Sequence, residues 1–294
     1  MGDSLDAPSP IAGVTIATAL RQMRSSLSKS ELKVAAVLLS NYPVAGLVNI
    51  SSLARKAGVS DPTVTRLVNK LGFDGFASFK AALQQELEAR LMAPTQVEPQ
   101  GIVNGVDTLS AAAALLSGEI SRSFVSLSVE DVELAVELLA DLDRKVLMCG
   151  GRISSLMARV FAWSLEVLRP GVTMIGEAPA ERTNRLLDID ASSLIVAFDF
   201  RRYQIDTVEF VHSAVAQGAK AILFTDPYLS PAAGFSDVVL HASINGVTPF
   251  NSMTSTLALV ETVLSLLIPR LGEDARSRMK HYVEISEGEN LSDH

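Results

Sequence analysis

Cysteine is nearly absent from this sequence of 294 residues, in which Cys149 stands alone. One thiol cannot form an internal disulfide framework or a metal site built from several cysteines. Long apolar runs are missing too, because no stretch reaches the roughly 18–20 uninterrupted apolar residues of a membrane span. The acidic start, MGDSLDAPSP, lacks the basic segment of a secretory signal. These absences predict a cytoplasmic protein without membrane association, metal or other cofactor.

Aromatic residues are also scarce, at 5%, yet the hydrophobic set reaches 48% and the mean hydropathy is +0.29. Such a composition is too apolar for a disordered chain. The length corresponds to roughly two domains by the usual size range. We therefore expect two folded domains.

The net charge of −8 is divided unevenly along the chain. Residues 21–80 carry nine Lys and Arg against three acids, a net charge of +6, which leaves −14 for the rest. This asymmetry is typical of a nucleic-acid-binding domain attached to an acidic one, although a solvated helical face gives similar counts.

Residues 14–92 have the pattern of several short helices. Ser28 and Glu31 have the spacing of a capping box at a helix start, and the helix is expected to end near Asn41, since Tyr42 precedes Pro43.

The segment at residues 50–73, ISSLARKAGVSDPTVTRLVNKLGF, has the spacing of a helix-turn-helix motif. Ala54 is small enough to sit where two helices touch, Gly58 suits the turn, and Val64 is a β-branched core residue. Pro62 falls in the first turn of the second helix, where a missing amide costs little. The second helix is therefore expected to enter the major groove of DNA.

The polar face of that second helix carries side chains suited to reading DNA. Arg can bind guanine bidentately, Asn can bind adenine, and hydroxyl and ammonium groups can bind phosphate. The candidate base-reading residues are Thr63, Thr65, Arg66 and Asn69, and the candidate phosphate contacts are Lys56, Ser60, Lys70 and Lys80. A helical hairpin with a polar face and no DNA partner is the alternative.

These motifs resemble the N-terminal domain of the RpiR/MurR family of bacterial transcriptional regulators. The resemblance covers roughly residues 14–90, and the run LGFDGFASFK after the second helix is its distinctive part. It implies a DNA-binding domain. Residues 91–106, which hold two prolines and two glycines and no long periodicity, are expected to form the linker that follows it.

The remainder of the chain alternates apolar runs with amphipathic stretches of helical length. The runs are VLMC at 146–149, VTMI at 172–175, SLIVAF at 193–198, AILFT at 221–225 and VVLHA at 238–242. This alternation predicts an α/β domain with a parallel five-stranded sheet flanked by helices. We assign it to residues 107–285, followed by a flexible tail at 286–294.

The run QGAKAILFTD at 217–226, the run SPAAGFSD at 230–237 and a long helix expected near 252–268 make this half resemble a SIS (sugar isomerase) domain. The resemblance implies dimerisation and a phosphate site made of two hydroxyl-rich loops. The first loop here reads GGRISS, so Arg152 replaces a glycine while Ser154 is retained. The second falls on DFRRYQ at 199–204, where charged residues replace serines and glycine. The candidate effector-binding residues are Gly150, Arg152, Ser154, Ser155, Asp199, Arg201, Arg202 and Gln204.

Long charged side chains at these positions make an ordinary sugar-phosphate site doubtful. One hypothesis is a different anionic effector, such as a carboxylate metabolite, bound by Arg152, Arg201 or Arg202. The competing hypothesis is that the arginines pair with Asp199 or Glu177, fill the pocket and leave no effector response.

Catalysis is the other alternative, because a SIS fold can also belong to a sugar-phosphate isomerase. Such a reaction needs a base beside the sugar, and none of the four histidines falls in the two loops. Phe161, Trp163 and Leu165 have the pattern of core residues on one helix.

The sequence therefore predicts a transcriptional regulator and not an enzyme. Its expected partners are double-stranded operator DNA, a small anionic effector and a second copy of the chain, as a homodimer or homotetramer.

Overall fold

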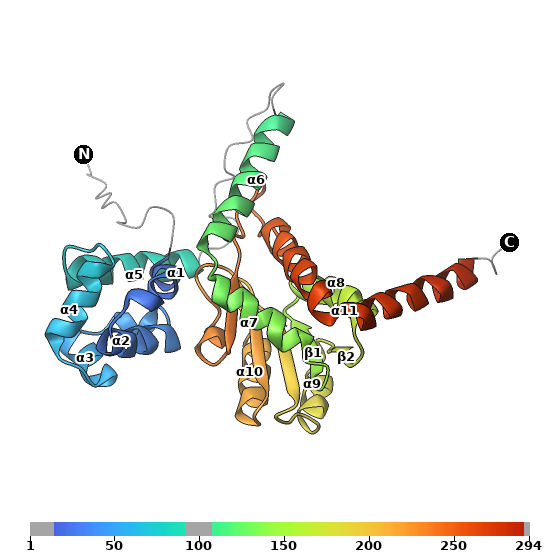
Figure 1. Cartoon of the computed structure of the whole chain (residues 1–294). Coiled ribbons are helices and arrows are strands. Elements are labelled where there is room, and N and C mark those ends of the chain that lie inside the picture. Colours follow the sequence, from blue (N-terminus) through green and yellow to red (C-terminus); the bar gives the residue numbers. More distant parts are fainter. Residues whose placement is uncertain (1–14, 92–107, 291–294) are drawn as a thin grey trace.

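The computed structural model describes residues 15–91 and 108–290. They form a helical head and an α/β domain, and the end of the last helix projects away from both (Figure 1). The linker predicted at 91–106 lies outside the described residues except at position 91.

Five α-helices and two short 3-10 helices make up the head. They are α1 (Ile16–Gln22), η1 (Arg24–Ser26), α2 (Lys29–Ser40), η2 (Val44–Gly46), α3 (Ile50–Ala57), α4 (Asp61–Lys70) and α5 (Phe76–Leu91). The predicted capping box is confirmed, since Ser28 caps α2 and Glu31 reaches back to its backbone N–H. Gly58 ends α3 at φ +64°, a left-handed conformation that glycine adopts without strain.

The α/β domain begins with two helices, α6 (Thr108–Ser126) and α7 (Val129–Ala140). Strands and helices then alternate: β1 (Lys145–Gly150), α8 (Ser155–Leu168), β2 (Val172–Met174), α9 (Pro179–Leu186), β3 (Ser193–Phe198), α10 (Ile205–Ala216), β4 (Lys220–Thr225), η4 (Pro231–Gly234), β5 (Val238–His241) and α11 (Thr254–Asn290). The five predicted strands are confirmed to within a residue or two at each end.

All five strands are parallel, in the order β2-β1-β3-β4-β5. Alternate side chains of each strand face opposite layers. Val146, Val196 and Phe224 pack on the side of α7, α8 and α11, whereas Ile195 and Leu223 pack on the side of α10. From β1 the chain adds β2 on one side and then crosses to add β3 on the other, so the strand order reverses between β1 and β3. Open α/β sheets bind ligands at such a point.

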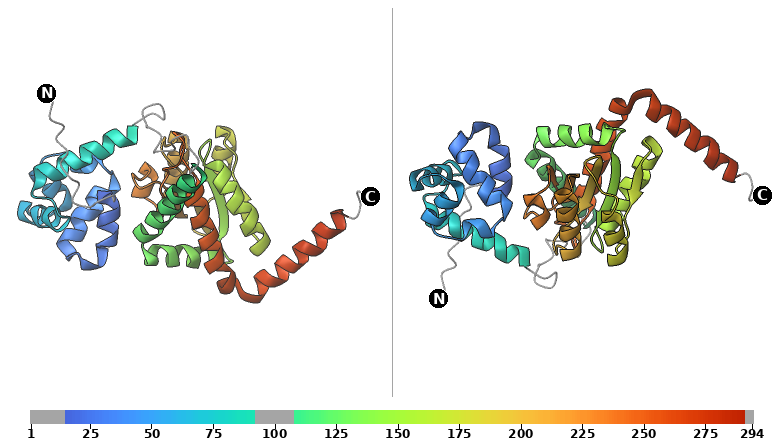
Figure 2. Two further views of the ribbon diagram at one scale, coloured as in Figure 1. Left: turned by 90° about the horizontal axis from the view of Figure 1, so that it is seen from above. Right: turned by 90° about the horizontal axis from the view of Figure 1, so that it is seen from below.

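The head packs against loops that follow β4 and β5, on one side of the α/β domain (Figure 2). Thr15 Oγ1 donates to Pro227 O at 2.8 Å, and Thr18 Oγ1 lies 3.4 Å from His241 Nε2. A Cβ on Gly234 would lie 2.5 Å from the carbonyl oxygen of Ser40, so the head requires glycine there.

The last helix, α11, is far longer than the segment near 252–268 that the sequence indicates. It is long and apolar enough to meet a membrane-span criterion by length and composition, but Leu259, Val263 and Leu267 lie in the core of the α/β domain. The backbone kinks at Gly272 and the helix continues to Asn290. Residues 286–290, expected in a flexible tail, are therefore helical, while 291–294 lie outside the described residues.

Candidate DNA-binding surface and ligand cavity

The second helix of the motif, α4, presents an exposed polar face on the head. Arg66 and Asn69 are exposed on α4, and Lys56 and Ser60 are exposed beside its start. Ser51 Oγ donates to Asp61 Oδ2 at 2.6 Å, which fixes the start of α4 against α3. A rigid helix with exposed Arg and Asn side chains matches the geometry of major-groove readers.

Thr63, expected on this exposed face, is instead buried at 5% exposure. It lies one residue before Val64, on the edge of α4 that turns into the core, and its Oγ1 accepts from Arg66 Nη2 at 3.0 Å. Thr63 therefore positions Arg66 and does not offer a surface for a base. Thr65, half-buried, donates to the carbonyl of Asp61.

Two of the residues expected to contact phosphate are either bonded to other protein groups or partly buried. Lys70 Nζ lies 3.1 Å from Glu31 Oε2 and donates to Ser26 O. Lys80, on α5, is half-buried. Lys56 and Ser60 remain the more accessible candidates.

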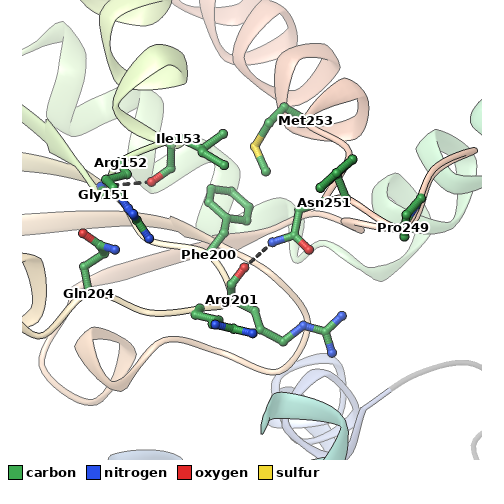
Figure 3. A pocket seen from close by; sticks show the side chains of 12 residues that line it. Gly151, Arg152, Ile153, Phe200, Arg201, Gln204, Pro249, Asn251 and Met253 are labelled. Atoms are coloured by element: carbon green, nitrogen blue, oxygen red, sulfur yellow. Dashed lines mark hydrogen bonds between the residues drawn. The ribbon is translucent and has the colours of Figure 1, made fainter. Parts of the chain in front are cut away.

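The α/β domain holds a cavity of about 550 Å³ at the carboxyl ends of β1 and β3. Such a volume suits a small metabolite. The two loops that the sequence indicates line it, and residues 249–253 form a third wall (Figure 3). Its lining residues are Gly151, Arg152, Ile153, Ser154, Phe200, Arg201, Arg202, Gln204, Pro249, Phe250, Asn251 and Met253.

Five of the eight predicted effector-binding residues line this cavity: Arg152, Ser154, Arg201, Arg202 and Gln204. Within residues 15–91 and 108–290, the guanidinium groups of Arg152 and Arg202 have no hydrogen-bonding or ion-pair partner. Guanidinium groups bind carboxylate and phosphate oxygens bidentately. The cavity is therefore suited to an anion.

The other three predicted residues do not line the cavity, because each is bonded to the protein behind it. Gly150 O accepts from Arg182 Nη2 at 2.9 Å. Ser155 Oγ donates to Glu177 Oε1 at 2.7 Å. Asp199 is fully buried and accepts from Ser230 Oγ and from the backbone N–H of Gln204.

Burial raises the pKa of Asp199 to about 6, and the hydrogen bond from Ser230 offsets part of that rise. No ion pair joins Asp199 or Glu177 to Arg201 or Arg202 in the part of the chain that the structure describes. The expected pairing of the arginines with Asp199 or Glu177 is therefore absent among the described residues.

Arg201 belongs to the cavity and also contacts the head. Its Nη1 donates to Ala89 O in the last turn of α5, and its guanidinium lies 5.1 Å from the centroid of the Tyr228 ring. Its backbone N–H donates to Asp226 Oδ2 at 2.7 Å. Burial raises the pKa of Asp226, and the bond from Arg201 acts in the opposite direction.

Arg90, one residue further along α5, contacts the same loops. Its guanidinium lies 4.7 Å from the centroid of the Tyr203 ring, and its Nη2 donates to Leu229 O at 2.6 Å. The hydroxyl of Tyr203 in turn donates to Asp226 Oδ1 at 2.8 Å. The loop that carries Arg201 and Tyr203 is thus bound on one side to the head and borders the cavity on the other.

Sequence reasoning missed the third wall of the cavity, residues 249–253, which precede α11. Asn251 Nδ2 donates to Arg201 O, so this segment is bonded to the arginine loop. Its position after the last strand was the available signal, because every loop that follows a parallel strand lies at the same edge of the sheet.

His241 and Cys149 are buried away from the cavity lining. Burial lowers the pKa of His241 to about 4, so it is neutral at pH 7. Burial raises the pKa of the Cys149 thiol to about 12, which keeps it protonated and unreactive.

Two family models match the chain. The helix-turn-helix domain of the rpiR family matches residues 14–90, and the SIS domain matches residues 138–266.

Among curated proteins, the chain is similar to the HTH-type transcriptional regulator YfhH of Escherichia coli, with 30% identity over 149 residues. That match covers 50% of this chain and 52% of YfhH, so the chain matches only about half of that relative's length.

Among solved structures, the sugar isomerase domain of an RpiR transcription factor from Sphaerobacter thermophilus matches with a TM-score of 0.57 and 24% identity, over 60% of this chain and 99% of that one. The Vibrio vulnificus NanR protein complexed with ManNAc-6P matches with a TM-score of 0.53 and 18% identity, over 92% of this chain and 97% of that one. Both likenesses establish the fold.

Proposed function

We propose that this chain, which carries a helix-turn-helix domain of the rpiR family and a SIS domain, represses or activates transcription in response to a small anionic metabolite. Operator DNA would bind at α4, and the metabolite would bind in the cavity between β1 and β3. A protein that works on DNA in this way acts in the cytoplasm.

The observation that carries this proposal is the loop at residues 199–204, which is shared by the cavity and the head. Arg201 lines the cavity and donates to Ala89 in α5. A ligand that draws the Arg201 guanidinium into the cavity would break that bond and loosen the contact with the head. Such a differential contact is what a ligand needs in order to shift the equilibrium between two states.

An anionic ligand is supported by the chemistry of the cavity. Three arginines line it, and no carboxylate does among the residues described. The relative NanR is complexed with ManNAc-6P, itself an anion.

An isomerase is the less supported alternative. Aldose–ketose isomerisation needs a positioned base beside the sugar, and the described lining of the cavity contains no His, Asp or Glu. YfhH is named a transcriptional regulator.

We further propose that the protein works as a homodimer formed through α8 and α11. Leu156, Val160 and Trp163 form an exposed apolar stripe on α8, at 57%, 41% and 60% exposure. Tyr282, on α11 beyond the kink, packs edge-on against Trp163. A two-fold dimer would cover this surface and present two α4 helices to a palindromic operator.

Selection from a randomised pool of DNA duplexes tests the proposal. The wild-type protein should enrich a motif of two half-sites related by dyad symmetry, and binding to it should weaken steeply as salt is raised. Failure to enrich any motif, together with turnover of sugar phosphates, would favour the isomerase instead.

A further inference from the structure

The serine hydroxyls that would hold a phosphate in the first loop are already used within the protein. Ser154 Oγ donates to Phe198 O at 2.7 Å and accepts from the backbone N–H of Gly151 at 3.0 Å. Ser155 Oγ donates to Glu177 Oε1 at 2.7 Å. Because a hydroxyl has only one proton to donate, neither serine can donate to a ligand without losing a bond to the protein.

Gln204 also covers the glycine of this loop. A Cβ on Gly151 would lie only 2.7 Å from Gln204 Cγ, so the side chain rests directly on the Gly151 backbone. The space through which a phosphate would approach the Gly151 backbone is therefore occupied by the Gln204 side chain. Among the described lining residues, Arg152 and Arg202 carry the guanidinium groups that have no partner, whereas Arg201 donates through Nη1 to Ala89 O. The side-chain amide of Gln204 is a further, uncharged donor.

Apolar side chains from all three segments also line the cavity, beside the polar groups of Gln204 and Asn251. Ile153 comes from the first loop, Phe200 from the second, and Pro249, Phe250 and Met253 from the third segment (Figure 3). Sugar hydroxyls need hydrogen-bond acceptors, and burying a hydroxyl without one is unfavourable. The described lining offers no Asp or Glu, and its side-chain amide oxygens are those of Gln204 and Asn251, so few acceptors are available for the several hydroxyls of a sugar.

From these three observations we propose that the cavity binds a small carboxylate with an apolar body, such as an aryl or branched-alkyl acid, and not a sugar phosphate. The carboxylate pairs with Arg152 and Arg202, and the apolar body lies against Phe200, Phe250 and Met253. The proposal rests on the proposed sensing function, because it names the ligand class of the same cavity.

Calorimetric titration of the full chain tests this assignment. The carboxylate probes are phenylacetate, benzoate and 4-methyl-2-oxopentanoate, and the sugar-phosphate probes are glucose 6-phosphate and N-acetylmannosamine 6-phosphate. At least one carboxylate should bind about tenfold tighter than either sugar phosphate. Phenylacetamide, which lacks the charge, should bind much more weakly than phenylacetate. Phenyl phosphate keeps the apolar body and changes the anion, so it tests which of the two determines the affinity.

Variants locate the site. Arg152→Gln and Arg202→Gln should each weaken the bound carboxylate about tenfold or more, whereas Arg159→Gln, on an exposed position of α8 outside the cavity, should not. Met253→Ser should weaken phenylacetate more than acetate. Thermal unfolding of each variant establishes that it is folded.

Tighter binding of a sugar phosphate, tighter binding of phenyl phosphate than of phenylacetate, unchanged carboxylate affinity in both arginine variants, or no binding of any carboxylate would each overturn the assignment. The proposed function is tested separately. A protein that binds a selected duplex and releases it with a sugar phosphate keeps that function and loses this assignment, whereas carboxylate binding without any duplex binding does the reverse.

Discussion

At the residue scale, Glu86 on α5 shows how burial couples one carboxyl group to the stability of the head. It accepts hydrogen bonds from the backbone N–H of Ile16 at 2.9 Å and from the hydroxyl of Tyr42. Burial nevertheless dominates and raises the pKa of Glu86 to about 7. Its folded-state pKa is thus above that of an unfolded chain, near 4.5.

This shift predicts a pH dependence of stability. Between about pH 4.5 and 7 the folded protein keeps a proton on Glu86 that the unfolded chain has lost, so the contribution of Glu86 to stability is lost as the pH rises through that window. The loss has an upper bound of about 3 kcal/mol. In Glu86→Gln this loss should be absent, as measured by urea unfolding at pH 5 and pH 8.

The pKa of His241 shifts in the opposite direction, from 6.5 down to about 4. His241 therefore adds to the free energy of unfolding as the pH rises from about 4 to 6.5. It is present in both wild type and Glu86→Gln, so comparing the two proteins cancels its contribution. An equal change of stability with pH in both proteins would contradict the assignment of Glu86.

Single residues also show which parts of the site could be predicted from the sequence and which could not. Arg152 and Arg202 line the cavity as predicted from their places after two strands. Thr63 was misassigned because it lies at the edge of the buried face of α4, and Trp163 was misassigned because it was grouped with Phe161 although it lies on the opposite face of α8. Trp163 lies two residues, about 200° around the helix, from buried Phe161, and it is 60% exposed.

At the scale of elements, the strands were predictable because buried parallel strands are continuous apolar runs. All six residues of β3 are buried, and it was located without error at 193–198. The turn at Gly58 was predictable from local chemistry. The wall at 249–253 and the docking of the head were not, because they depend on contacts between segments far apart in sequence.

The exposed stripe on α8 gives a prediction for assembly. Trp163→Asp places a charge where we propose that two copies meet, so it should shift the dimer towards monomer in sedimentation experiments. Leu187→Asp is the matched control, since Leu187 is an 82% exposed apolar residue on a different surface at the end of α9. The same association state in wild type and Trp163→Asp would contradict the proposed interface.

At the scale of the whole molecule, the contact between the head and the α/β domain would connect DNA binding to the cavity. Arg90 is bonded to Leu229 and lies on the Tyr203 ring, while Arg201 reaches Ala89 from the cavity. Coupling free energies between two sites are typically about 1–3 kcal/mol. The few contacts of Arg90 and Arg201 have free energies in the same range, so they are sufficient to couple the cavity to DNA binding.

Arg90→Gln should therefore reduce the effect of a cavity ligand on operator affinity. The ligand's own affinity for the cavity should stay within a few-fold, because Arg90 does not line it. Operator titrations with and without phenylacetate, in wild type and variant, measure the change. A full ligand response in Arg90→Gln would show that coupling does not pass through this contact.

The account depends most on α4 as the DNA-reading helix, and the affinity of Arg66→Ala for a selected duplex tests it most directly. Fluorescence anisotropy should show a loss of about 1–3 kcal/mol in specific binding, with the circular dichroism and the thermal unfolding of the α/β domain unchanged. Arg185→Ala, at an exposed position of α9, should bind the duplex like wild type. Unaltered duplex affinity in Arg66→Ala would contradict the assignment.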